Sequence, residues 1–145
     1  MLVETTVWLN KTSGGGVLVR YHQDDMLNYN GYFVGWRNAS ILTIESWRGS
    51  DGNVTLGSFD MTTLDCGCTT AGWNMLRVLV AGPTIAVYAN PMLPDARTAE
   101  GIVPRLTVHD EQWSTGGVAL MATGAAASSQ CTRFDYIGVL PASVL

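Results

Sequence analysis

The chain has 145 residues and a net charge of −4, with 14% charged and 47% hydrophobic residues. This length fits one domain with a single core. The acidic balance argues against non-specific binding of nucleic acid, which needs a surplus of Lys and Arg. No apolar run reaches the roughly 18 residues of a membrane-spanning helix. The 16 glycines and the scarcity of long charged helix formers favour an all-β protein with many turns.

Alternation of apolar and polar residues begins at Val3, which predicts a first strand over residues 3–10. Residues 13–16 (SGGG) are predicted as a turn, 23–30 as a polar loop and 91–105 as an irregular insertion. Further strands are predicted over 17–21, 32–37, 41–47, 54–58, 74–81, 84–89, 106–109, 117–122 and 133–140. About ten short strands with regular turns and no convincing helix predict an all-β sandwich or barrel. Nothing marks a linker or an internal repeat, so residues 1–145 are interpreted as one domain.

The clearest pair of strands is 74–81 and 84–89, joined by a turn at Gly82-Pro83. Both strands are rich in β-branched residues, and their apolar side chains alternate. Asn90-Pro91 ends the second strand, because proline cannot donate to a ladder. The pattern predicts a hairpin with one core face and one partly polar face, which carries Arg77 and Tyr88.

Several segments together resemble a known family. Residues 73–90 match the pattern W-x-x-L-R-V-x-V-x-G-x-x-I-x-V-Y-x-N. The segments GGVAL at 116–120 and FDYIGV at 134–139 follow, and residues 14–36 carry the R-Y and W positions of an upstream pattern. The chain therefore resembles a concanavalin A-like jelly roll of the laminin G-like type over nearly its whole length. The resemblance implies a two-sheet antiparallel sandwich, with one convex and one concave sheet.

The same family also contains glycoside hydrolases. Those similar to family 16 carry E-x-D-x-x-E on one strand, which places acid and nucleophile carboxylates on one sheet face. This motif is absent: Glu45 stands alone on its strand, and Asp110 and Glu111 are neighbours that face apart if extended. No Ser-His-Asp or Cys-His arrangement is evident either. We therefore expect no catalytic residues and a non-enzymatic protein.

Five residues are candidate ligand contacts. If the polar strand faces form the concave sheet, aromatic side chains with a few polar groups could stack a sugar ring. The alternative is that these aromatic residues only cover the second face or pack under the insertion. Trp36 and Trp73 are expected in the core. The candidate contacts are Trp8, Trp47, Arg77, Tyr88 and Trp113.

An oxygen-rich loop suggests a metal. Asp24, Asp25 and Asn28 offer the ligand type that calcium prefers, and the family resemblance implies a rim loop that often holds calcium. Their spacing matches no EF-hand, and the alternative is a solvated loop whose Asn caps its own turn. Calcium is therefore a candidate cofactor beside the solvated-loop alternative, and no other cofactor is indicated.

The three cysteines are Cys66, Cys68 and Cys131. A closed zinc site needs four ligands, and the two histidines lie far from the Cys-Gly-Cys segment in sequence. In an oxidising compartment a disulfide from Cys131 to Cys66 or Cys68 is the better interpretation.

Three N-glycosylation sequons start at Asn10, Asn38 and Asn53, all at expected strand ends or turns. They favour an extracellular, secreted protein, with coincidence as the alternative. The first residues lack a signal-peptide pattern, so a mature fragment or a domain of a larger chain is expected.

These observations predict a non-catalytic extracellular module that binds carbohydrate or mediates adhesion. A second hypothesis is a structural subunit of an extracellular filament, sheath or coat, because the closing strand 133–140 has few charges and offers an edge to a neighbouring subunit. A glycoside hydrolase-like enzyme comes third.

Overall fold

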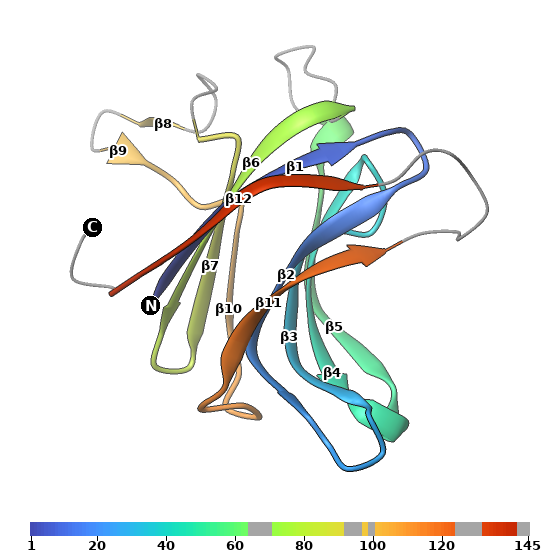
Figure 1. Cartoon of the computed structure of the whole chain (residues 1–145). Coiled ribbons are helices and arrows are strands. Elements are labelled where there is room, and N and C mark those ends of the chain that lie inside the picture. The colour runs from blue at the N-terminus through green and yellow to red at the C-terminus, as the bar shows by residue number, and fades with distance from the viewer. Residues whose placement is uncertain (64–70, 92–96, 99–100, 124–131, 142–145) are drawn as a thin grey trace.

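The computed structural model describes residues 1–63, 71–91, 97–98, 101–123 and 132–141. Two five-stranded antiparallel sheets face each other in a sandwich (Figure 1). Sheet A has the order β10-β7-β6-β1-β12, and sheet B has the order β11-β2-β3-β4-β5. The strands are β1 (Leu2–Leu9), β2 (Gly14–Gln23), β3 (Tyr29–Trp36), β4 (Ile41–Arg48), β5 (Asn53–Asp60), β6 (Gly72–Ala81), β7 (Thr84–Ala89), β8 (Arg97–Thr98), β9 (Gly101–Ile102), β10 (Leu106–His109), β11 (Gly117–Thr123) and β12 (Arg133–Leu140).

The all-β expectation is confirmed. In the described ranges the only helical segments are the short 3-10 turns Gly49–Asp51 and Met61–Thr63, and none is long and apolar enough to cross a membrane. The sheet topology fits the predicted jelly roll, whereas the laminin G-like type remains a prediction. Part of the insertion 91–105 forms the two-stranded pair β8–β9, which the sequence did not predict.

The core lies between the two sheets and comes from the alternation seen in the sequence. The predicted core face of the β6–β7 hairpin is buried, with Val78 directly opposite Val87. Sheet B contributes the largest buried side chains, Trp36 and Tyr32, on one face of β3.

Two of the sequence-based expectations about these strands were wrong. Trp73 lies on the outward face of sheet A with 57% of its surface exposed, and residues 14–16 belong to β2 rather than to a turn.

Charged and phenolic groups link three strands across the outward face of sheet A. Tyr136 on β12 donates from its hydroxyl to Glu4 on β1 at 2.7 Å, and Arg77 Nε on β6 donates to the other carboxylate oxygen at 2.7 Å. The hydrogen bond from Tyr136 and then the Arg77 guanidinium lower the pKa of Glu4 against the opposing effect of burial. Burial and the bond to Glu4 raise the pKa of Tyr136 to about 12.

The closing strand β12 lies at the edge of sheet A (Figure 1). It pairs with β1 on one side, and no described strand pairs with its other side. The start of the chain does not cover this edge, because Met1 is hydrogen-bonded to Val80 and β1 lies between β6 and β12. Ile137 and Val139 on β12 are 41% and 51% exposed. An apolar strand edge is therefore open within the described residues.

Candidate binding cleft at one end of the sandwich

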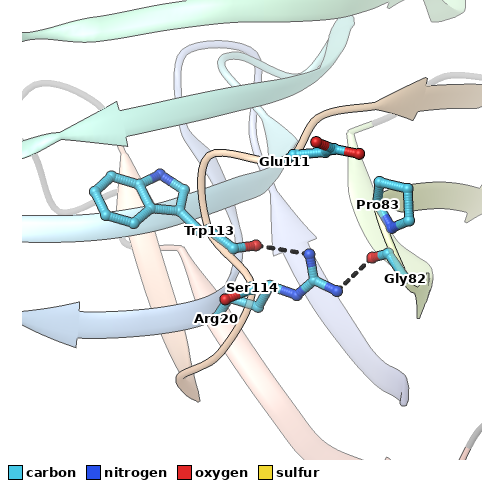
Figure 2. A pocket seen from close by; sticks show the side chains of 6 residues that line it. All are labelled: Arg20, Gly82, Pro83, Glu111, Trp113 and Ser114. Carbon is cyan, nitrogen blue, oxygen red and sulfur yellow. Dashed lines mark hydrogen bonds between the residues drawn. The ribbon is translucent and has the colours of Figure 1, made fainter.

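A cleft of about 430 Å³ opens at one end of the sandwich. Two connections and one strand border it: the β6–β7 turn, the segment between β10 and β11, and the irregular part of β2. The residues that line the cleft are Arg20, Gly82, Pro83, Glu111, Trp113 and Ser114 (Figure 2).

The backbone near the cleft takes unusual conformations. Arg20 has a positive φ of 52° inside β2, where the pairing with β3 shifts between Val19 and His22. Gly116 has φ 136°, and a Cβ there would collide with the Arg20 backbone. A non-glycine residue with positive φ is uncommon and costs free energy, so the surrounding contacts must hold it in place. The bulge directs the Arg20 side chain toward the connections rather than along the sheet.

Arg20 ties two of the connections together. Its guanidinium donates from Nη1 to the Trp113 carbonyl at 2.6 Å and from Nη2 to the Gly82 carbonyl, as Figure 2 shows. A guanidinium has five N–H donors, so the remaining ones are left for solvent or a ligand. Arg20 therefore both fixes the cleft walls and supplies its cationic group.

The segment after β10 is held by hydrogen bonds to the core. Tyr32 donates from its hydroxyl to the Asp110 carboxylate at 2.6 Å and accepts from the Trp113 backbone N–H at 3.0 Å. Burial and the bond to Asp110 raise the pKa of Tyr32 to about 12, so it stays a neutral donor. Trp113 Nε1 donates to Ser46 at 3.2 Å, and the His22 ring lies edge-on to the indole at 4.9 Å.

The cleft presents a mixed set of groups. Glu111 and Ser114 are exposed and make no hydrogen bond or ion pair within the described residues. Pro83 adds an apolar surface beside them (Figure 2). A carboxylate, a hydroxyl and spare guanidinium N–H groups around an apolar patch suit a small polyhydroxylated ligand, whose hydroxyls donate and accept. Glu111 is the one carboxylate among the lining residues, whereas glycoside hydrolysis needs a pair.

The five candidate ligand contacts do not form one continuous surface. Trp8, Arg77 and Tyr88 lie on the outward face of sheet A, where Arg77 is directly opposite Tyr88. Trp47 belongs to sheet B and faces outward there, so the sandwich separates it from the other three. Trp113 is in the cleft segment as expected, but its indole is partly buried against the core.

Trp47 has structural partners. Its ring stacks on Phe33 at 5.5 Å, and its indole N–H donates to the Glu45 carboxylate at 2.9 Å. Arg37 lies over both rings and forms an ion pair with Glu45. These contacts explain why Glu45, alone on its strand, is buried on an outward face.

The Asp24 carboxylate, one of the proposed calcium ligands, is engaged in hydrogen bonds within its own loop. The Asp24 carboxylate accepts hydrogen bonds from the Met26 and Asn28 backbone N–H groups and from the Asn28 amide, each at 2.9 Å. These bonds, those from Asn28 above all, lower the pKa of Asp24. Asp25 is exposed, and the described part of the chain contains no cluster of three His, Cys, Asp or Glu residues that could hold a metal. The loop is capped by one of its own side chains, but that side chain is Asp24 rather than an Asn, and calcium binding stays a prediction.

The remaining site predictions are untested. Cys66, Cys68 and Cys131 lie outside the described residues. Asn38 and Asn53 are exposed, at the β3–β4 connection and the start of β5. Asn10 is partly buried and accepts hydrogen bonds from the Thr12 and Ser13 backbone. Glycosylation at the three positions stays a prediction.

Sequence reasoning missed most of the cleft. It identified Trp113 as a candidate ligand contact and Gly82-Pro83 as a turn, but it gave no ligand role to Gly82-Pro83, Arg20, Glu111 or Ser114. In the sequence Arg20 has the appearance of an ordinary strand residue, because the alternation of apolar and polar residues does not reveal a β-bulge. The proximity of these segments depends on the strand order, which joins residues about 60 to 90 positions apart.

Comparison with protein-family models finds no match, and comparison with curated proteins finds none either. Solved structures do resemble the chain. The carbohydrate binding module CBM66 from Bacillus subtilis superposes with a TM-score of 0.64 at 13% identity, covering 94% of this chain and 71% of that one. The GH43 protein BlXynB from Bacillus licheniformis superposes with a TM-score of 0.53 at 14% identity, covering 94% of this chain but 26% of the larger one. At these identities the likeness shows a shared β-sandwich fold.

Proposed function

We propose that the protein is a non-catalytic, extracellular carbohydrate-binding module and that the cleft at Arg20 holds the sugar. The observation that carries the proposal is the cleft itself, with its fixed guanidinium and the uncommitted Glu111 and Ser114 side chains. The shared fold with a carbohydrate binding module supports it. The volume lies in the range of small-molecule sites, and the walls are preorganised by Arg20 and Tyr32.

The proposal is tested by removing cleft groups that do not hold the loops. A panel of neutral and acidic oligosaccharides identifies a ligand, and calorimetry then compares variants. Glu111→Gln removes the carboxylate while keeping the shape, and Ser114→Phe fills the cleft. We expect Glu111→Gln to raise the Kd about tenfold or more, because a hydrogen bond to a charged group contributes about 1.5–3 kcal/mol. Ser114→Phe should raise it at least as much, because the phenyl ring occupies the space of the ligand.

Asp51→Asn is the control, since Asp51 is an exposed carboxylate that does not line the cleft. It should bind as the unmodified protein does. The proposal fails if no saccharide binds, or if a saccharide binds and both cleft variants retain its affinity.

The open edge of β12 favours a second candidate function, a subunit that assembles with copies of itself. Natural proteins usually cover or charge such an edge, but here it carries exposed Ile137 and Val139. The occupant in this hypothesis is the β12 strand of a second copy, paired antiparallel so that sheet A continues across a two-fold axis.

Ile137→Lys tests this second candidate by placing a charge at the edge. If the chains pair through β12, light scattering should show a dimer that the variant converts to monomer. Val54→Lys is a matched control, because Val54 is also 41% exposed and also lies on an edge strand, β5. A protein that stays monomeric at high concentration, or a dimer that survives Ile137→Lys, contradicts the hypothesis.

A further inference from the structure

Two tryptophans and an arginine form one row on the outward face of sheet A. Trp8 on β1 lies directly opposite Trp73 on β6 and, on its other side, opposite Arg133 on β12. Trp73 is the most exposed Trp, Tyr or Phe among the described residues, at 57%. We call Trp8, Trp73 and Arg133 the Trp–Arg row.

The row is separate from the cleft. Trp73 is the second residue of β6, whereas Gly82 at the cleft follows its last residue. Nine residues of extended strand span roughly 30 Å, so the two sites lie at opposite ends of the sandwich. A ligand at one site cannot touch the other unless it is a long polymer.

The Arg133 guanidinium is held in place without a counter-ion. It lies over the Trp8 ring, 5.4 Å from the ring centroid, and it makes no ion pair or hydrogen bond within the part of the chain that the structure describes. Stacking on an indole orders the guanidinium plane while its N–H groups remain available at the edge. Planar N–H groups of this kind bind carboxylates in a bidentate manner.

We propose that the Trp–Arg row binds a hexuronate residue of an acidic polysaccharide. The C–H face of the pyranose ring lies on Trp73, and the carboxylate accepts from the Arg133 guanidinium. The two groups meet complementary parts of one ligand: an apolar ring face lies on the exposed indole, and an anion lies on the Arg133 guanidinium. A nucleic acid is a poorer match, because the chain carries a net charge of −4 and the row offers a single cation.

The test uses polygalacturonate and alginate as probes, with binding followed by affinity electrophoresis and by calorimetry on short oligomers. Trp73→Ala and Arg133→Gln should each weaken binding about tenfold or more, whereas Arg133→Lys should retain part of the affinity because it keeps the charge but not the planar fork. Methyl-esterified polygalacturonate, which keeps the ring but lacks the charge, should bind as weakly as the Arg133→Gln variant binds the free acid.

Asp51→Asn serves as the control and should leave uronate binding unchanged, because Asp51 is exposed and belongs to neither the cleft nor the row. Glu111→Gln is measured beside it to separate binding at the cleft from binding at the row. The proposal is overturned if neither uronate polymer binds, if Arg133→Gln or Trp73→Ala binds as the unmodified protein does, or if Glu111→Gln abolishes uronate binding. Because Trp73 and Arg133 are exposed, both variants should fold, which circular dichroism and an unchanged melting temperature would show.

Discussion

Gly16→Ala is expected to lower the free energy of unfolding by about 3 kcal/mol or more, although it adds only one methyl group. Gly16 on β2 lies opposite Gly35 on β3. A Cβ at position 16 would stand 2.6 Å from the Gly35 Cα and closer still to the Val34 carbonyl oxygen. These are backbone atoms of a paired strand, so they can move only by disrupting the β2–β3 ladder. Where alanine fits the native backbone without strain, Gly→Ala stabilises a protein by about 0.4–1 kcal/mol, because it reduces the conformational entropy of the unfolded chain.

Urea denaturation followed by tryptophan fluorescence measures the effect. Gly35→Ala should behave alike, because its Cβ would stand 2.6 Å from the Gly16 Cα. Gly138→Ala on β12 is the matched control: the nearest atom, the Glu4 carbonyl oxygen, would lie 3.9 Å away, which is ordinary contact. A Gly16→Ala variant as stable as Gly138→Ala would show that the two backbones are not in close contact.

The glycine pair also illustrates why some strand boundaries were predictable and others were not. The hairpin of β6 and β7 was predicted to the residue at nearly every end, because its alternation and its Gly82-Pro83 turn are local signals. The start of β2 was predicted as a turn because Gly14 to Gly16 has the composition of a loop. Only the close approach of β3 explains glycines in the middle of a sheet, and that approach is a tertiary feature.

The direction in which a strand side chain points was easier to predict than the sheet to which the strand belongs. Trp8, Arg77 and Tyr88 do turn away from the core, as alternation required. Alternation also places Trp73 on the same outward face, in register with Trp8, yet its position at the head of a family-like motif suggested the core. Which sheet a strand joins is not visible in its own sequence, so Trp47 could not be separated from Trp8 before the strand order was known.

The cleft and the Trp–Arg row depend on different parts of this architecture. The cleft is built from connections, which Arg20 and Tyr32 hold in a fixed arrangement. The row is built on three adjacent strands, whose pairing alone sets the spacing of its side chains. Binding at the row should therefore tolerate changes in the connections, whereas binding at the cleft should be sensitive to any substitution that releases Arg20.

The ion pair on sheet B leads to the other large expected effect. The Glu45 side chain is 4% exposed and accepts hydrogen bonds from Arg37 and Trp47, whereas the Arg37 side chain is 40% exposed. Arg37→Met would leave the carboxylate buried with the Trp47 N–H as its remaining partner. Removing one partner of a buried pair costs about 3–5 kcal/mol, and the exposure of Arg37 places the expected loss near the lower end, about 3 kcal/mol.

Glu45→Gln should cost less, about 1 kcal/mol, because Arg37 can turn toward water while the amide oxygen still accepts from Trp47. The decisive measurement is the double variant Arg37→Met with Glu45→Gln, which buries no charge and should therefore be more stable than Arg37→Met alone. Denaturation curves of the four proteins give this comparison directly. If the losses simply add, so that the double variant is the least stable of the four, the buried charge of Glu45 does not depend on Arg37 for its stabilisation.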